Sequence, residues 1–496
     1  MAKFSKRGLG SGISLILSAV FWGVSMLLVY DENYATSEST DLSDIRIGDS
    51  DAGEFQNWMN ISMGGRKIGY TMHSLTKSPL GYILKDYSLI KLPMGGTVRE
   101  VYLDSYAVLN MDYSMKVFTF GLISDDYTTD IHGEVRDGKL IVRMRSGSSE
   151  SMATFEAGKG IYLPSVVPML ARAQNFLNGE FFLPTFDPFS LSMDELGIVI
   201  GTVEKVQTDL GESHGYRVSM SFSGVTSLMW IGDDGAVLRE EETGGLAMVR
   251  TDRERALDMP VVDAGGRDLL DDLAVPCNGE IPEARKVKYL KVSMNGIEPE
   301  FFDLEDDFQS VVSRDPLVLE IHPFQIEPSI LADSAEFLGP QPFLQVDDPR
   351  IISASEKITI GLSSGEARAE ALGQWVFDNV TKDLTVSLPS AVDVLEVKRG
   401  DCNEHTALYT ALARAAGLPT KVCIGIVYKD GHFYYHAWPA VFLGGWRPLD
   451  PTFGQPIADG VHIKLLHGGF ERQADLMRVV GKISVTVLEY SYGENL

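Results

Sequence analysis

Cysteines and basic residues are scarce in this sequence. The 496 residues include three cysteines, Cys277, Cys402 and Cys423, and so few cannot form a disulfide framework. Lysine and arginine total 43 against 69 aspartate and glutamate residues, which gives a net charge of −26. Nucleic acids and anionic membrane surfaces attract basic patches, so this balance argues against both as main partners. We expect no nucleic-acid partner.

Sequence motifs that would indicate a cofactor are also missing. There is no Gly-rich phosphate-binding loop of the expected form, no paired CxxC and no HExxH. The acidic run from Asp303 to Asp307 lacks the spacing of an EF-hand and is more typical of a solvated loop than of a calcium site. We therefore expect neither a cofactor nor a metal ion.

One long apolar run lies near the N-terminus. Leu9 to Tyr30 contains no charged residue, and as a helix it would span about 33 Å, enough for a bilayer core. Basic residues precede the run and Asp31 follows it, so the positive-inside rule places residues 1–8 in the cytoplasm and the bulk outside it, in the periplasm. We predict an uncleaved single-pass transmembrane helix at 9–30, with a cleaved signal peptide as the alternative.

The rest of the chain indicates an α+β protein in which a β-rich antiparallel region precedes an α+β core. Hairpin signals recur at Gly64-Gly65, Asp137-Gly138 and Asp234-Gly235. One helix, about Ser165 to Leu177, interrupts this region, and we expect a long antiparallel sheet curved around or packed on it. The predicted organisation is a tether at 31–54, a β-rich domain at 55–255, a linker at 256–284, a small β module at 285–335 and the α+β core at 336–496.

The core contains a cysteine at the predicted start of a helix. The stretch from Arg399 to Asp401 predicts a turn, and Asn403 to Ala416 predicts a helix with apolar residues at helical spacing. Cys402 would then lie where free N–H groups and the helix dipole favour a thiolate, with Arg399 adding to that bias. An earlier helix is predicted from Ser364 to Val380, with Ser363 and Glu366 at the spacing of a capping box.

A histidine and an aspartate follow on strands predicted to be neighbours. Lys421 to Tyr428, Phe433 to Phe442 and Trp446 to Asp450 predict three antiparallel strands. A three-residue loop centred on Leu443 would put His436 opposite Asp450 on one face. A two-residue Gly-Gly turn would pair Asp450 with Pro439 and send the two side chains to opposite faces. A contact between His436 and Asp450 therefore requires the odd loop, or a bulge.

These three motifs in this order resemble the transglutaminase-like superfamily of papain-like cysteine acyl transferases and proteases. The resemblance rests on Gly400-Asp401-Cys402 before a helix, His436-Ala-Trp438 on a strand, and Asp450-Pro-Thr452 on the next. It covers roughly residues 338–469 and makes 336–496 a transglutaminase-like catalytic domain. It implies that Cys402 is the nucleophile, His436 the general base and acid, and Asp450 the residue that orients His436.

Other interpretations of these residues stay open. Cys402 could be a buried structural thiol or could pair with Cys423 in a disulfide, and His405 is a rival base. His436 could be a satisfied core histidine, and Asp450 could be a turn residue. In the family a side-chain donor upstream of the nucleophile helps to form the oxyanion hole. Gln374 is a possible donor, although a place on the helix surface fits it better.

The function expected from these residues is thiol-mediated acyl transfer. The cysteine would attack an amide carbonyl, and the acyl group would pass to water or to an amine. The expected partner is a protein or peptide amide in the cell envelope, reached from an anchor in the lipid bilayer. The alternative is a non-catalytic envelope protein whose β-rich region binds a protein or lipid partner.

Overall fold

The computed structural model divides the chain into two compact units, which are described one at a time. The first unit comprises residues 1–145 and 150–269, and the second comprises residues 146–149 and 270–496. The described residues are 40–41, 55–94, 96–124, 127–158, 160–188, 191–222, 225–241, 246–260, 274–331, 334–388, 390–469, 472, 475–476 and 478–493. The helix predicted at 9–30 lies outside them, and no helix within them is long and apolar enough to span a membrane.

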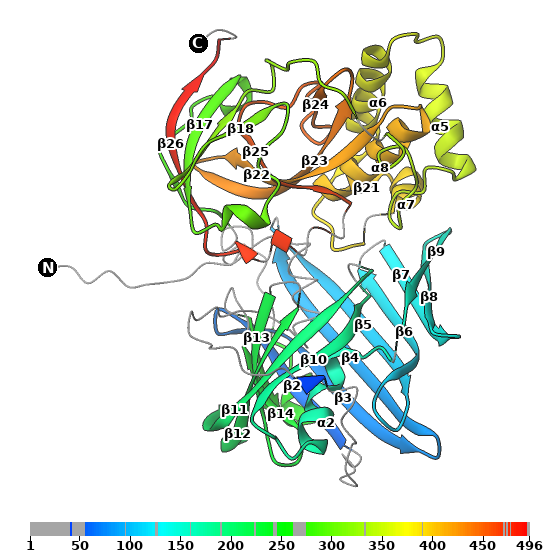
Figure 1. Ribbon diagram of the computed structural model, residues 1–496, viewed down its shortest axis with the longest axis vertical. Helices are drawn as coiled ribbons and strands as arrows, with labels where there is room; N and C mark the ends of the chain where they lie inside the picture. Colours follow the sequence, from blue (N-terminus) through cyan, green and yellow to red (C-terminus); the bar gives the residue numbers. More distant parts are fainter. Residues whose placement is uncertain are drawn as a thin grey trace, which may run out of the picture. The chain divides into compact units, whose positions relative to one another are not determined.

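The first unit is built on a single sheet of fifteen strands (Figure 1). β1 and β10 are parallel, and the strand pairs from β10 to β15 and from β2 to β7 are antiparallel. Antiparallel pairing of β15 with β2 joins the two halves of the sheet. The strands are β1 Thr40–Asp41, β2 Phe55–Met63, β3 Arg66–Ser78, β4 Gly81–Met94, β5 Thr97–Leu109, β6 Met115–Ser124, β7 Tyr127–Arg136, β8 Lys139–Ser146, β9 Ser149–Glu156, β10 Gly179–Asp187, β11 Ser192–Thr208, β12 Gly211–Phe222, β13 Val225–Ile231, β14 Val237–Glu241 and β15 Leu246–Thr251.

The three predicted hairpins are confirmed, but the predicted helix is shorter than expected. Gly65, Gly138 and Gly235 each take a positive φ in the turns β2–β3, β7–β8 and β13–β14. A separate short helix, α3 (Arg253–Leu257), follows β15. The helical segment comprises η2 (Pro164–Val166) and α2 (Val167–Ala173). The segment ends before Leu177 because Asn175 and Phe176 both take φ of 52°, which no helix accommodates. Phe176 instead stacks on Tyr216 with ring centroids 4.0 Å apart.

The second unit combines helices with two antiparallel-rich sheets. Its four-stranded sheet has the order β24-β23-β22-β25, and a five-stranded sheet has the order β16-β26-β17-β19-β18. The strands are β16 Cys277–Asn278, β17 Tyr289–Asn295, β18 Gln309–Arg314, β19 Leu317–Ile321, β20 Thr381–Lys382, β21 Arg399–Gly400, β22 Thr420–Lys429, β23 His432–Phe442, β24 Trp446–Pro448, β25 His462–Gly468 and β26 Ser484–Ser491. The helices are η4 Ala284–Lys286, η5 Pro299–Phe301, α5 Pro349–Thr359, α6 Gly365–Asn379, α7 Ala391–Val397 and α8 Cys402–Ala415.

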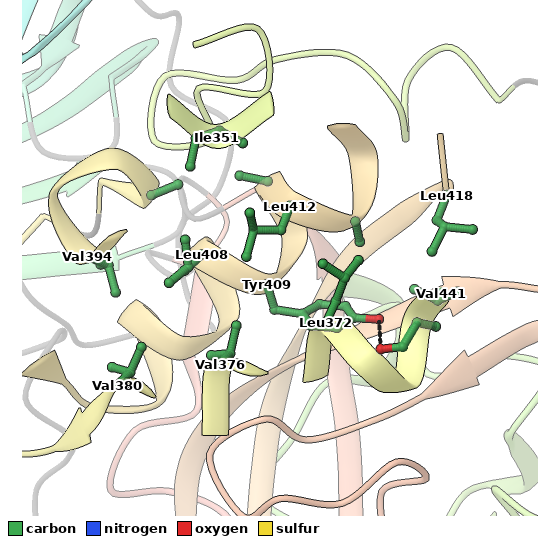
Figure 2. Close-up of a cluster of buried hydrophobic side chains, with 14 of the residues drawn as sticks. Ile351, Leu372, Val376, Val380, Val394, Leu408, Tyr409, Leu412, Leu418 and Val441 are labelled. Atoms are coloured by element: carbon green, nitrogen blue, oxygen red, sulfur yellow. Dashed lines mark hydrogen bonds between the residues drawn. The ribbon is translucent and has the colours of Figure 1, made fainter. Parts of the chain in front are cut away.

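Helix α8 is the centre of the second unit. Every residue from Glu404 to Arg414 is buried, because α5, α6 and α7 cover one side of the helix and β22 and β23 cover the other. The helix is not apolar all round, and its buried polar side chains need partners: Thr406 donates to Ala437 O and Arg414 to Thr420 O. Figure 2 shows Leu408, Tyr409 and Leu412 of α8 among apolar side chains from α5, α6 and α7. This packing fixes the N-terminal end of α8, where Cys402 lies.

Two local expectations were wrong. The N-cap of α6 is Ser364, whose side chain accepts a hydrogen bond from Ala367 N, and not Ser363. The capping box expected with Glu366 therefore does not form. The acidic run is not wholly solvated either, because the Asp306 side chain is 3% exposed and pairs with two lysines. Lys421 and Lys464 lie 2.7 and 2.9 Å from its carboxylate, and a buried carboxylate needs such partners.

Removing a side chain from the apolar cluster around α8 should destabilise the second unit. Leu372 of α6 is fully buried in this cluster, whereas Ile360 is 81% exposed. We expect Leu372→Ala to lower the free energy of unfolding by about 2–5 kcal/mol, because it leaves a cavity. Ile360→Ala should change it by about 0.5 kcal/mol or less. Denaturant unfolding of both variants checks this, and equal effects would contradict the assignment of the core.

Candidate active site

The backbone at the start of α8 is held by a capping box. Asp401 accepts a hydrogen bond from Asn403 N, and the Glu404 side chain accepts one from Asp401 N, each at 2.8 Å. Gly400 takes a φ of +156°, and a Cβ there would lie 2.3 Å from the Cβ of Glu404. Only glycine fits at this position, so the turn before Cys402 depends on it. The predicted turn and helix start are confirmed.

The surroundings of Cys402 favour the protonated thiol, contrary to expectation. Burial raises its pKa well above the ordinary value, an ionised Asp401 would raise it further, and the Ala437 backbone acts in the opposite direction. Burial and the neighbouring Glu404 also raise the pKa of Asp401 itself. The expected help from Arg399 is missing, because its guanidinium pairs with Asp383. The N-terminal end of the helix dipole favours a Cys402 thiolate, but the burial of the thiol and the carboxyl group of Asp401 at the N-cap outweigh this effect.

The side chains of α8 place Cys402 beside strand β23. Thr406, one turn after Cys402, donates a hydrogen bond to Ala437 O at 3.0 Å. The Cys402 thiol is held against the Ala437 backbone, one residue after His436. Within the part of the chain that the structure describes, Cys402 and His436 form no hydrogen bond with each other. Catalytic hydrogen bonds are often long in free enzymes and shorten when substrate binds, so the placement remains suitable for proton transfer.

His436 is oriented by Asp450. Its Nε2 lies 2.7 Å from Asp450 Oδ2, and both residues are buried, with exposed fractions of 7% and 0%. The imidazole is stacked between Trp438 and Phe453, with ring centroids 5.9 and 5.1 Å away. Because Nε2 is engaged by the carboxylate, Nδ1 is the nitrogen left for a proton from a thiol.

The register that brings His436 and Asp450 together differs from the expected one. The loop has three residues, as required, but it is centred on Gly444 and joins the pair Phe442 and Trp446. Gly444 takes a φ of +82°, which suits this loop type. Asp450 lies past the end of β24, level with Trp438 and not opposite His436, as the bond from Leu449 N to Pro439 O shows. The two side chains still share a face, because the shift is an even number of residues.

Asp450 is satisfied on both oxygens. Oδ1 accepts hydrogen bonds from Thr452 N at 2.7 Å and Phe453 N at 3.1 Å, so Asp450 also closes a turn, as the alternative interpretation proposed. Oδ2 accepts from His436 and from a second histidine, His462, whose Nε2 is 3.1 Å away. Although burial acts to raise the pKa of Asp450, the two histidines hold it well below its usual range.

His462 belongs to a chain of buried charges that the sequence did not reveal. Its Nδ1 lies 2.8 Å from Asp459 Oδ1, and Arg285 lies 2.9 Å from the other oxygen of Asp459. Burial acts to lower the pKa of His462, but Asp459 and Asp450 raise it to about 9. His462 is therefore an imidazolium at neutral pH that donates to both carboxylates. A single histidine in an apolar strand carries no sequence signal of this role.

His436, Asp450 and His462 also have the composition of a metal site. One ligand atom from each lies within 4.8 Å of the others. The His436–Asp450 separation of 2.7 Å is that of a charge-assisted hydrogen bond. Ligand atoms bonded to a tetrahedral zinc at about 2.0–2.1 Å would lie roughly 3.3 Å apart. The three side chains are thus arranged as a hydrogen-bonded relay.

The segment that carries these residues matches a known family. Residues 352–451 match the family model described as the transglutaminase-like superfamily. This segment is a transglutaminase-like core. It contains Cys402, His436 and Asp450, so the family resemblance of the sequence is confirmed over this range. His462 and Asp459 lie beyond the matched residues of the transglutaminase-like core. No curated protein matches the chain.

Solved structures resemble the chain only loosely. A candidate cysteine protease from Cytophaga hutchinsonii aligns at 15% identity over 41% of this chain and 86% of its own, with a TM-score of 0.27. A β-barrel-like protein of a domain of unknown function from Brucella abortus aligns at 12% identity over 40% of this chain and 97% of its own, with a TM-score of 0.32. A candidate protease from Parabacteroides distasonis aligns at 9% identity over 68% of each chain, with a TM-score of 0.17. TM-scores this low carry no argument.

The competing residues of the transglutaminase-like core are occupied elsewhere. His405 is buried, its Nδ1 lies 2.7 Å from Asp401 O, and burial lowers its pKa. The amide of Gln374 is exposed and donates to Asp378 on the next turn of α6, so Gln374 is a helix-surface residue. Cys402 and Cys423 are both free thiols, which removes the disulfide alternative.

The protonation of His462 should make the stability of the transglutaminase-like core pH-dependent. Its folded pKa of about 9 exceeds the unfolded value near 6.5. Its contribution is therefore fully present below pH ~6.5 and is lost as the pH rises through about 9. The difference in unfolding free energy between wild type and His462→Gln should shrink by about 3 kcal/mol over this range. Denaturant melts at a series of pH values check this, and a constant difference would contradict it.

The charge beside Cys402 offers a second test. Asparagine caps a helix as well as aspartate does, so Asp401→Asn keeps the start of α8 but removes the ionisable carboxyl group. Where Asp401 is ionised, we expect this variant to lower the pKa of Cys402 and to raise its rate of alkylation by iodoacetamide, because the thiolate is the reactive form. Site-resolved mass spectrometry measures the rate. Fast alkylation of wild-type Cys402 at pH 6, unchanged in the variant, would contradict the raised pKa.

Proposed function

We propose that the second unit is a transglutaminase-like cysteine enzyme that transfers acyl groups from amides. Cys402 is the nucleophile, His436 the general base and acid, and Asp450 the residue that orients His436. The observation that carries this proposal is the buried His436–Asp450 hydrogen bond of 2.7 Å, with the Cys402 thiol held against the residue after His436. The family match over residues 352–451 supports the same class of chemistry.

The first half of the reaction uses the free nitrogen of His436. Nδ1 takes the proton of the Cys402 thiol as sulfur attacks the amide carbon, so a C–S bond forms and the carbonyl oxygen becomes an oxyanion. The N–H of Cys402 belongs to the first turn of α8, where N–H groups have no partner within the helix, and it is a suitable oxyanion donor. His436 then gives its proton to the leaving amine as the C–N bond breaks.

The second half regenerates the thiol. Water or an amine gives a proton to His436 and attacks the thioester carbon, after which the C–S bond breaks and the sulfur recovers the proton. Water yields a carboxylic acid, so the enzyme is a protease or amidase, while an amine yields a new amide. Asp450 holds the imidazole in place throughout and offsets the positive charge that it gains. The thiol of the free enzyme is neutral, so proton transfer accompanies the attack.

The location and substrate remain part of the proposal. An N-terminal helix at 9–30 would anchor the enzyme in the bilayer with its bulk outside the cytoplasm, where protein and peptide amides of the envelope are the accessible substrates. The net charge of −26 favours substrates that are neutral or basic around the scissile amide.

Two observations favour a non-catalytic second unit. The raised pKa of Cys402 and the lack of a hydrogen bond between Cys402 and His436, both described residues, would suit a recognition module that retains the fold alone. The two possibilities differ in whether His436 activates Cys402, which can be measured without knowledge of the natural substrate.

Acylation of Cys402 by an activated ester should require His436. We expect p-nitrophenyl acetate to acylate Cys402 in the full-length protein, and His436→Ala to slow this step by about 10²–10⁴-fold through loss of the general base. Mass spectrometry of the trapped thioester measures the rate. Cys423→Ser is the matched control, because Cys423 is fully buried in β22 and should not contribute. Equal acylation rates in wild type and His436→Ala would support the non-catalytic module.

A further inference from the structure

A row of polar side chains crosses the inner face of the sheet in the first unit. Asn57 of β2 is paired with His73 of β3, His73 with Asp86 of β4, and Asp86 with Ser105 of β5. The row is hydrogen-bonded within itself, because His73 Nδ1 lies 2.7 Å from Asp86 Oδ1 and Ser105 donates to Asp86 Oδ2 at 3.0 Å. Inward positions of such a sheet are normally apolar, so the row needs a reason.

Two buried oxygens near this row have no partner. Asn57 is 2% exposed, and its Nδ2 donates to Val237 O at 2.9 Å, which leaves Oδ1 as an acceptor without a donor. Glu240 of β14 is also 2% exposed, and its Oε1 has no donor either. A buried polar atom without a hydrogen bond is costly, and two acceptors in one place need a molecule that donates.

Both residues line the same cavity, which is closed on one side by η2 and α2. Its volume is about 30 Å³, while one water molecule needs roughly 10–15 Å³. His73 and Asp86 form part of the polar wall, and the remaining wall is mostly apolar. The apolar lining residues are Phe55, Met59, Leu84, Pro164, Pro168, Met169, Met229 and Val237. The cavity therefore has a polar end and an apolar flank.

Glu240 at the polar end has no neighbouring cation to keep it ionised, because no lysine or arginine is among the described residues that line the cavity. Burial alone raises the pKa of Glu240, with no neighbouring cation to offset it. His73 is already engaged by Asp86, so the described part of this wall favours the neutral carboxyl of Glu240. A molecule that brings both hydrogen-bond donors and a positive charge would satisfy the two acceptors and let Glu240 ionise.

We propose that this cavity binds the ammonium group of a small primary amine. The ammonium supplies three donors, which match Glu240 Oε1 and Asn57 Oδ1, and one positive charge, which would favour loss of the Glu240 proton. The ammonium group itself fits this volume, and a short alkyl stem would have room only if Met59 and Met229, which are flexible, shift to accommodate it. A bound water molecule would donate to the same two oxygens but would leave Glu240 protonated. This site is independent of Cys402 and of the proposed acyl transfer.

The proposal can be tested with a charged ligand and its neutral counterpart. We expect n-propylammonium to bind the full-length protein in the millimolar range and at least about tenfold more tightly than n-propanol, which has the same size but no charge. Isothermal titration calorimetry or ligand-observed NMR measures both. Equal binding of the two would mean that the cavity is only an apolar pocket, and binding of neither would mean that it holds only water. Either result overturns the proposal.

A conservative variant assigns the binding to Glu240. Glu240→Gln keeps the shape of the side chain and removes the charge, and it should weaken n-propylammonium at least about tenfold with little effect on n-propanol. Glu134→Gln, at an exposed position of β7, is the matched control and should change neither. Unchanged n-propylammonium binding in Glu240→Gln would overturn the assignment.

The pH dependence of the wild-type protein gives a test that needs no variant. The titratable groups on the described cavity wall are Glu240, Asp86 and His73. Binding of n-propylammonium should strengthen as the pH rises and Glu240 loses its proton, whereas binding of n-propanol should not change. If Glu240→Gln folds normally by circular dichroism, it should remove this dependence. Binding that is flat with pH in the wild type would contradict a role for Glu240.

Discussion

The second unit depends on keeping one carboxylate ionised in a dry interior. Asp450 is fully buried, and its two oxygens accept four hydrogen bonds, two from backbone N–H groups and two from histidines. An ion without such partners would be protonated or would unfold the region. These four bonds join β23, the turn after β24 and the first residue of β25, so the charge of Asp450 and the alignment of the sheet support each other.

The sharing of Asp450 between two histidines shapes the acid–base balance of the site. His462 is an imidazolium held by Asp459 and Arg285, so Asp450 compensates a permanent positive charge as well as orienting His436. The burial of Cys402 opposes a thiolate at the same time. The free site is thereby biased towards a neutral thiol, which ionises only when a substrate provides compensating interactions.

The sequence predicted the elements of this site better than their details. Periodicity located α8 and the strands β22 and β23, because these segments are long and buried. The expected three-residue loop before β24 was centred on Leu443, one residue too early, because the sequence Leu443-Gly444-Gly445 is compatible with either position. His462, the Asp401–Glu404 capping box and the buried charge of Asp306 were missed. Their partners lie on other elements or need backbone geometry, so neighbouring residue types gave no signal.

In the β-rich unit, the alternation of polar and apolar residues does not account for the polar residues on the inner face of the sheet. Alternation assigns polar residues to the solvent side of a strand, yet His73 and Asp86 face inwards and satisfy each other there. Where inward polar residues are fully paired, as Asp450 is in the second unit, the fold itself explains their retention. Glu240 has the same burial as those residues but no partner on Oε1. Burial without a cation favours the protonated form of Glu240, whereas the paired Asp450 is ionised. The difference between the two units thus lies in what completes the site: the chain in one and, as we propose, a bound molecule in the other.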